Sequence, residues 1–203
     1  MEEVPSPLDF RTENDAKAWA SEATRNRPYR TKFFHLITKE LMQHYQRPKI
    51  LELGSGPGEL ANYIVTDIEC TKYVAFDFSQ AMHDLAIKQF PKLVEKVEFE
   101  NGNFKAENWS KNLTGFDAVI SMQAIHEIRH KFLTVKLFKQ IKSCLADTAI
   151  FLYCDHYFGE SGLEIVDLYM TDEEKKQTLE LAGFNNIRCL HKEGTLSLWK
   201  AEN

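Results

Sequence analysis

A glycine-rich turn between a short apolar run and an amphipathic run is the feature of this 203-residue chain that most constrains its fold. The segment reads ILELGSGPGELANYI, with glycines at positions 54, 56 and 58. The apolar run is typical of a buried strand, and the residues after the turn carry apolar side chains at helical spacing. Glycine permits positive φ angles and lets a ligand approach the backbone closely. The segment therefore predicts a strand, a ligand-binding turn and a helix in direct succession.

The chain after residue 48 repeats this alternation of short apolar runs and longer amphipathic runs. The runs that predict strands are KILELG, YVAFDF, VEFENGNF, FDAVISMQ and AIFLYCDH. The runs between them that predict helices are ELANYIVTD, SQAMHDLAIKQF and HKFLTVKLFKQIKSCL. Strands that alternate with helices form parallel, doubly wound sheets. We therefore expect a single α/β domain over residues 48–203.

The first 47 residues predict a helical cap ahead of the sheet. Their apolar side chains recur at helical spacing on both sides of a break at Pro28. This cap is placed to fold over the carboxyl ends of the strands, where ligands bind in doubly wound folds. For the apolar residues Phe33, Phe34, Ile37 and Leu41 we expect packing that attaches their helix to the core. Tyr29 and Arg30, next to the break, are the residues that we expect to contact a substrate.

The C-terminal segment predicts a helix followed by an antiparallel hairpin. Thr171 and Glu174 form a capping box at the start of a helix over 172–182, and Gly183 ends that helix. Two further apolar runs, NIRCLH and TLSLWKA, are separated by the turn Lys-Glu-Gly at 192–194. This pattern indicates a hairpin at the edge of the sheet.

Composition and charge argue against several classes of protein. The formal net charge of -5 disfavours a nucleic-acid binder that neutralises many phosphates. No apolar run approaches the about 20 residues that a membrane span needs. The four cysteines form no CxxC pair, which is typical of reduced thiols, and the acidic, proline-broken start is not a signal peptide. We expect a cytoplasmic protein with a small-molecule partner and neither a membrane nor a nucleic-acid partner.

The residues around the glycine turn favour an adenosine ligand that lacks a diphosphate. Glu59 stands where the dinucleotide fingerprint GxGxxG requires a small third residue, and a carboxylate there repels a diphosphate. This disfavours NAD and FAD. Asp77 ends the second predicted strand, where an acidic residue accepts hydrogen bonds from ribose hydroxyls. Asn103 and Phe104 end the third strand and are placed to meet the edge and the ring of an adenine.

With these features the chain resembles the class I S-adenosylmethionine-dependent methyltransferases. The resemblance covers roughly residues 48–203 and rests on Glu52, the glycine turn, Asp77, Asn103-Phe104 and the closing run LELAGFNNIRCL. It implies a seven-stranded, mostly parallel sheet with strand order 3-2-1-4-5-7-6 and an antiparallel strand 7. It also implies S-adenosylmethionine as the cofactor and transfer of its methyl group as the activity.

The resemblance also implies which residues contact the cofactor. The glycines pass close to its methionine part, Glu52 helps to hold its amino group through the loop or through water, Asp77 takes the ribose and Phe104 the adenine. The full expected set is Glu52, Gly54, Ser55, Gly56, Gly58, Asp77, Phe78, Asn103, Phe104 and Met122. The family usually has aspartate where this chain has Asn103, but an asparagine can both accept from and donate to an adenine edge.

Residues 126–130 read HEIRH, which matches the HExxH box of zinc peptidases. Zinc bound by such a box needs both histidines on one helix face and a third protein ligand. The first glutamate after Glu127 is Glu160, which lies beyond a complete predicted helix and strand. We therefore expect neither a zinc peptidase nor a metal site.

His126 and His156 lie at the ends of the fourth and fifth predicted strands, where ligands bind. Either histidine is placed to accept a proton from a methyl acceptor or to orient it, and Asp155 is placed beside the same substrate pocket. The alternative for His126 is local capping or packing. The expected function is methyl transfer to a small molecule by in-line displacement. The alternative is a non-catalytic, methyltransferase-like module that acts through a partner.

Overall fold

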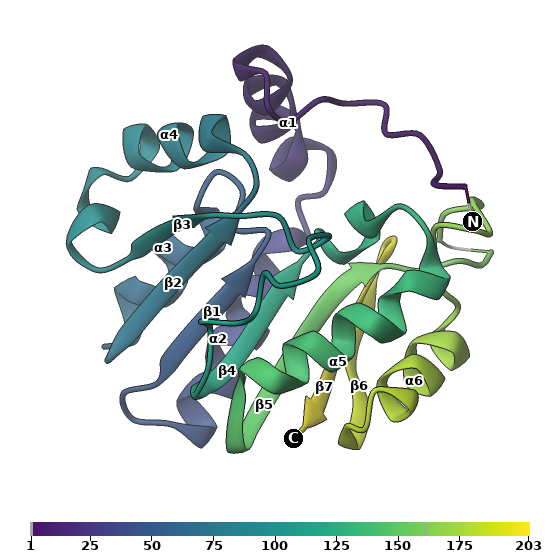
Figure 1. Ribbon diagram of the computed structural model, residues 1–203. Coiled ribbons are helices and arrows are strands. Elements are labelled where there is room, and N and C mark those ends of the chain that lie inside the picture. The colour runs from purple at the N-terminus through teal and green to yellow at the C-terminus, as the bar shows by residue number, and fades with distance from the viewer. Residues whose placement is uncertain (1, 161) are drawn as a thin grey trace.

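The computed structural model describes residues 2–160 and 162–203, which form one seven-stranded sheet with helices on both faces (Figure 1). The strands are β1 Lys49–Leu53, β2 Lys72–Asp77, β3 Glu98–Asn101, β4 Phe116–Met122, β5 Leu145–His156, β6 Asn185–Glu193 and β7 Leu196–Glu202. Their order is β3-β2-β1-β4-β5-β7-β6. β7 pairs antiparallel with β5 and β6, and the other pairs are parallel. The predicted fold class and strand order are confirmed.

The helices begin and end at the signals that the sequence carries. They are α1 Glu13–Asn26, α2 Arg30–His44, α3 Glu59–Asp67, α4 Gln80–Gln89, α5 Thr134–Cys144 and α6 Asp172–Leu181, with short 3-10 helices η1 Pro91–Glu95, η2 Ile125–Ile128 and η3 Lys131–Leu133. The capping box of Thr171 and Glu174 is present at the start of α6. The predicted break at Pro28 separates α1 from α2.

Two apolar clusters fill the two faces of the sheet. One cluster includes Phe138 of α5 and Phe151 of β5, and it lies under α5 and α6. The other includes Phe33, Ile37 and Leu41 of α2, each fully buried. α2 therefore packs against the sheet, as the helical spacing of its apolar side chains predicts. α1 and the segment before it lie above the carboxyl ends of the strands (Figure 1).

The order of the strands places the candidate site beside β1, between β2 and β4. Strand order reverses here, and ligands in doubly wound folds bind at such a point outside the carboxyl ends of the strands. The backbone amide of Gly54 donates to Phe76 O at 2.8 Å, and Ser121 Oγ donates to Leu53 O at 2.9 Å, so β1 is held at its carboxyl end from both sides. In the part of the chain that the structure describes, no helix is long and apolar enough to cross a membrane.

Candidate active site

The loop after β1 has three glycines with left-handed backbone conformations. Gly54, Gly56 and Gly58 have φ angles of +70°, +53° and +78°. A Cβ at Gly54 would lie 2.1 Å from the Cβ of Ala124, whereas a Cβ at Gly56 would meet Trp19 Cζ3 at 3.9 Å. Gly54 is therefore required for packing between the loop and the segment after β4, while Gly56 leaves space above the loop.

Asp77 holds this loop in place from the end of β2. Its carboxylate accepts hydrogen bonds from the backbone amide of Gly56 at 2.8 Å and from that of Ser79 at 2.9 Å. Burial raises the pKa of Asp77, and these backbone hydrogen bonds oppose the rise. A carboxylate has about four lone-pair positions, so Asp77 has capacity left for a hydroxyl group of a ligand.

Glu52 lies under the loop and is almost fully buried, with 2 % of its surface exposed. Tyr73 Oη donates to Glu52 Oε2 at 2.7 Å. Burial raises the pKa of Glu52 to about 8, and the nearby charge of Asp77 adds to the rise. The carboxyl group is therefore mostly protonated at neutral pH.

A cavity, here called the cofactor cavity, lies between the glycine loop and α1. Its lining includes eight residues of the expected cofactor set, Glu52, Gly54, Ser55, Gly56, Asp77, Phe78, Phe104 and Met122. Gly58 is outside the lining, and a Cβ there would lie 2.8 Å from that of Ala86, so this glycine serves packing against α4. Asn103 is also outside, because its Oδ1 accepts from the Lys105 backbone amide at 2.9 Å and its side chain caps a local turn.

The two expected substrate residues of the N-terminal region lie in different places. Arg30 lines the cofactor cavity, where its Nη1 donates to Glu59 Oε2 at 2.9 Å. Tyr29 lies outside the cavity linings, with its hydroxyl 3.3 Å from Thr195 Oγ1. A Cβ on Gly194 would lie 2.3 Å from the Tyr29 ring, so the ring packs on the β6–β7 turn.

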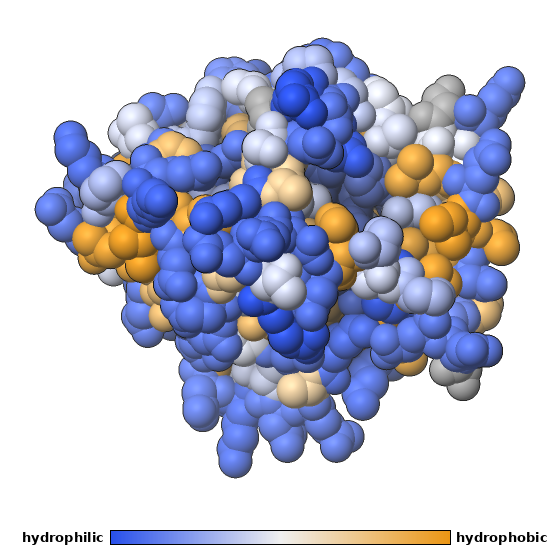
Figure 2. Space-filling model, turned by 90° about the horizontal axis from the view of Figure 1, so that it is seen from above, coloured by the Kyte–Doolittle hydropathy of each residue, from blue (hydrophilic) through white to orange (hydrophobic). Residues whose placement is uncertain are grey.

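A second cavity, here called the acceptor cavity, adjoins the cofactor cavity at the same end of the sheet. Five residues line both, namely Phe10, Trp19, Gln123, His126 and Glu127. The acceptor cavity continues past Ala23, Leu168 and Tyr169. Figure 2, which looks onto this end of the molecule, shows patches of hydrophobic surface among a mostly hydrophilic one.

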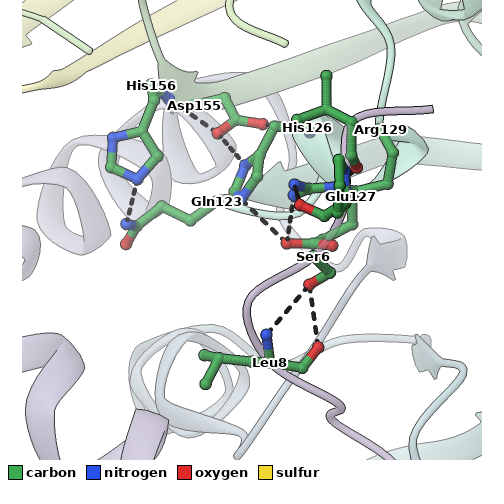
Figure 3. Close-up of polar contacts among 10 residues, drawn as sticks. Ser6, Leu8, Gln123, His126, Glu127, Arg129, Asp155 and His156 are labelled. Carbon is green, nitrogen blue, oxygen red and sulfur yellow. Dashed lines mark hydrogen bonds and ion pairs between the residues drawn. The ribbon is translucent and has the colours of Figure 1, made fainter. Parts of the chain in front are cut away.

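His126 stands at the edge that the two cavities share and is paired with Asp155 (Figure 3). Its Nδ1 lies 2.7 Å from Asp155 Oδ1, its backbone amide donates to Asp155 Oδ2 at 2.9 Å, and its Nε2 lies 3.3 Å from Glu127 Oε1. Burial lowers the pKa of His126, but the charge and hydrogen bond of Asp155, with help from Glu127, outweigh burial and raise this pKa to about 10. Burial raises the pKa of Asp155, and His126 outweighs it and brings this pKa to about 2. At neutral pH the pair is therefore an imidazolium and a carboxylate.

His156 lines the acceptor cavity, but both of its ring nitrogens already have partners. Nε2 lies 3.2 Å from Gln123 Nε2, and Nδ1 lies 2.9 Å from Thr195 Oγ1. Burial lowers the pKa of His156 to about 3, despite the nearby charge of Asp155. Asp155, expected to contact substrate, is 1 % exposed and lies behind His126 instead of lining the acceptor cavity.

The HEIRH segment does not form one helix. His126 lies in η2, Arg129 has a left-handed φ of 67°, and His130 Nδ1 accepts from the Phe132 backbone amide at 3.4 Å at the start of η3. The two histidines therefore lack the shared helix face that a zinc box requires. Arg129 instead donates to the carbonyl oxygens of Val4 at 2.8 Å and Pro5 at 2.6 Å, which holds the N-terminal segment beside the acceptor cavity.

Sequence reasoning missed three other polar residues at this site. Gln123 and Glu127 line both cavities, and Lys175 is fully buried behind Asp155. Lys175 Nζ donates to the Asp155 carbonyl oxygen at 2.9 Å and to Ser197 Oγ at 2.8 Å. The position of Glu127 next to His126 in the sequence could have indicated that Glu127 belongs to the site. Nothing in the sequence indicates that Lys175 of α6 reaches through to β5.

Comparison with known proteins identifies the family. A family model described as a methyltransferase domain matches residues 23–192. The chain belongs to this family. A curated relative, the non-reducing polyketide synthase prhL of Penicillium brasilianum, is 26% identical over 125 residues, which are 56% of this chain and 5% of that protein. The chain thus spans a small part of the curated relative that it matches.

Solved methyltransferase structures share the fold. DhpI in complex with SAH has a TM-score of 0.72 and 18% identity, with 93% of each chain covered. Human N-acetylserotonin methyltransferase in complex with SAM has a TM-score of 0.70 and 17% identity, with 98% of this chain and 60% of that chain covered. These likenesses confirm the predicted class I methyltransferase fold, and the family match identifies the chain as a methyltransferase domain, as the sequence predicted.

Proposed function

We propose that this chain transfers a methyl group from S-adenosylmethionine in the cofactor cavity to a small organic molecule in the acceptor cavity. The observation that carries the proposal is the edge common to both cavities, which bears the His126–Asp155 pair. The free thiols of all four cysteines support a cytoplasmic location, as their spacing in the sequence predicts.

The residues of the cofactor cavity fit such a molecule. Asp77 has carboxylate oxygens for ribose hydroxyls, Phe104 and Met122 offer apolar surface to an adenine, and Gly56 leaves room beside the loop. Glu52 supplies a carboxyl group that can hold the amino group of the methionine part of the cofactor. When bound, S-adenosylmethionine supplies an electrophilic methyl group on a sulfonium. Asn103 is not part of the proposed contacts, because its side chain is used in a local turn.

His126 is the residue that we propose to accept the acceptor's proton. Asp155 orients its ring through Nδ1, which leaves Nε2 directed toward Glu127 at the edge between the cavities. The imidazolium must first lose its proton, so His126 works as a base only as the pH rises toward its pKa of about 10. His156 has no free ring nitrogen and is proposed to orient a neighbouring side chain.

Ligand binding measured by thermal unfolding tests the cofactor part of the proposal. We expect S-adenosylmethionine and S-adenosylhomocysteine to protect the protein, by about 2.7 kcal/mol at about 100 times the dissociation constant. NAD⁺ and Zn²⁺ should give no protection. Transfer of a labelled methyl group to a panel of small acceptors then tests the activity. Binding without transfer to any acceptor would support the non-catalytic module, and protection by NAD⁺ alone would contradict the cofactor assignment.

Cofactor binding at pH 7 should release about one proton from Glu52. The protein alone keeps Glu52 protonated because burial raises its pKa to about 8, and a ligand ammonium nearby favours the charged carboxylate. Calorimetric titration with S-adenosylhomocysteine in buffers of different ionisation enthalpy measures this proton. E52Q should bind without releasing it. Identical heats of binding by the wild-type protein in all buffers would show that Glu52 does not respond to the ligand.

A further inference from the structure

Gln123 directly follows β4 and has a strained conformation where the two cavities adjoin. Its φ is 56°, and it is one of three non-glycine residues with positive φ among the described residues. The residue lines both cavities although only 7 % of its surface is exposed. Such a backbone conformation is unfavourable and persists where the surroundings enforce it, often at functional sites.

A chain of hydrogen bonds fixes the direction of the Gln123 amide. Gln123 Nε2 lies 3.2 Å from His156 Nε2, His156 Nδ1 lies 2.9 Å from Thr195 Oγ1, and that hydroxyl lies 3.3 Å from Tyr29 Oη. Because burial lowers the pKa of His156 to about 3, its ring is neutral. Since the amide nitrogen of Gln123 can only donate, the neutral ring accepts through Nε2 and carries its proton on Nδ1, which donates to Thr195 Oγ1. Figure 3 shows the amide nitrogen toward His156 and the amide oxygen turned away.

The amide oxygen that results is buried and has no hydrogen-bond partner within residues 2–160 and 162–203. A buried acceptor without a donor loses its hydrogen bond to water and gains none in return, so native proteins rarely contain one. Because Gln123 lines both cavities, a molecule that enters them is able to supply the missing donor.

The walls of the acceptor cavity limit what that molecule is. Trp19, Ala23 and Leu168 line it and favour an apolar body. A carbonyl oxygen repels an oxyanion or another carbonyl oxygen, so the group that meets Gln123 Oε1 carries a hydrogen.

We propose that Gln123 Oε1 accepts a hydrogen bond from an uncharged O–H or N–H group of the methyl acceptor. The acceptor is then a largely apolar molecule that enters with its proton in place. This inference rests on the proposed function, since it names the substrate class of the acceptor cavity. It also gives Tyr29 and His156 a role as positioning residues, which act on the substrate through the amide of Gln123.

Pairs of small probes with nearly equal shape test the missing donor. The protein loaded with S-adenosylhomocysteine is titrated by NMR with phenol against toluene, and with indole against indene, which lacks the N–H. Q123M removes the amide at similar length, and Q46M changes an exposed glutamine as the control. Phenol and indole are the donor probes, and toluene and indene are their counterparts without a donor. We expect the ratio of affinities, donor probe over counterpart, to be about tenfold greater in the wild type and in Q46M than in Q123M.

Several results would overturn the inference. One is an equal preference for the donor probes in wild type and Q123M, and another is the failure of every probe to bind. A third is tighter binding of benzoate or acetophenone than of the donor probes, which would mean that the amide points the other way. The same titrations without S-adenosylhomocysteine separate this inference from the proposed function. If S-adenosylhomocysteine does not bind, the proposed function fails, while the probes still report on Gln123.

The hydrogen-bond chain behind Gln123 has its own test. T195V removes the hydroxyl between His156 and Tyr29, so the amide of Gln123 loses its fixed direction. We expect T195V to lose part of the preference for phenol over toluene and T195S to retain it. A purely structural role for Thr195 would change thermal stability in T195V and leave the preference unchanged.

Discussion

Replacing His126 with glutamine lowers kcat for methyl transfer by about 10²–10⁴-fold and leaves cofactor affinity nearly unchanged. The loss is expected because the ring at the edge between the cavities is the proposed proton acceptor, whereas the proposed cofactor contacts are made by the glycine loop and Asp77. Initial rates with a labelled methyl group and calorimetric binding of S-adenosylhomocysteine measure the two quantities. H35Q changes an exposed histidine and should match the wild type.

The pH profile shows whether the ring acts as a base. Asp155 and Glu127 raise the pKa of His126 to about 10 against burial, with His156 and Tyr169 packed on the same ring. Only the neutral ring accepts a proton, so kcat/KM of the wild type should rise about tenfold per pH unit from pH ~7 to pH ~10. D155N removes the charge, which lowers the pKa of His126 and moves the rise to lower pH. Flat profiles, or identical ones for both proteins, would rule out His126 as the base.

The fold was predictable because its signals are local. Each predicted apolar run is a strand, each amphipathic run is a helix, and the glycine turn lies where strand order reverses. Parallel strands bring their carboxyl ends to one edge. The positions of Asp77, Phe104 and His126 along the chain were therefore enough to bring them to the same end of the sheet.

The pairing of side chains was not predictable from those positions. Tyr29 packs on Gly194, far away along the chain, because α2 docks on the sheet face beside the β6–β7 turn. Asp155 was expected at the substrate, but its side chain turns toward His126 because β4 and β5 are neighbours. A positive φ at Gln123 has no sequence signal, since glutamine rarely adopts it.

The HEIRH segment shows why a short motif needs its backbone context. Histidines four positions apart share a face in an α-helix. Here Arg129 interrupts the segment with a left-handed conformation, so the same spacing separates His126 from His130. His126 contacts Asp155, and His130 caps the turn that leads to α5.

Two single-methyl substitutions in the glycine loop should separate folding from cofactor binding. G54A places a Cβ 2.1 Å from that of Ala124 in a left-handed backbone, so we expect it to lower the free energy of unfolding by about 2–4 kcal/mol. G56A has only Trp19 Cζ3 within 4 Å, at 3.9 Å, and should cost about 1 kcal/mol from its φ of +53°. Its methyl group nevertheless enters the cofactor cavity, so we expect a loss of affinity for S-adenosylhomocysteine of about tenfold or more.

A third glycine calibrates the cost of the backbone conformation. Gly115 has a φ of +70°, and a Cβ there would come within 3.8 Å of Lys49 Nζ, away from the cofactor cavity. G115A should therefore match G56A in denaturant unfolding and match the wild type in calorimetric binding. If G56A binds as tightly as G115A, the space above Gly56 does not hold the cofactor. If G54A is as stable as G115A, the loop must be able to move away from Ala124 at little cost. The contact between Gly54 and Ala124 then does not hold the loop in place.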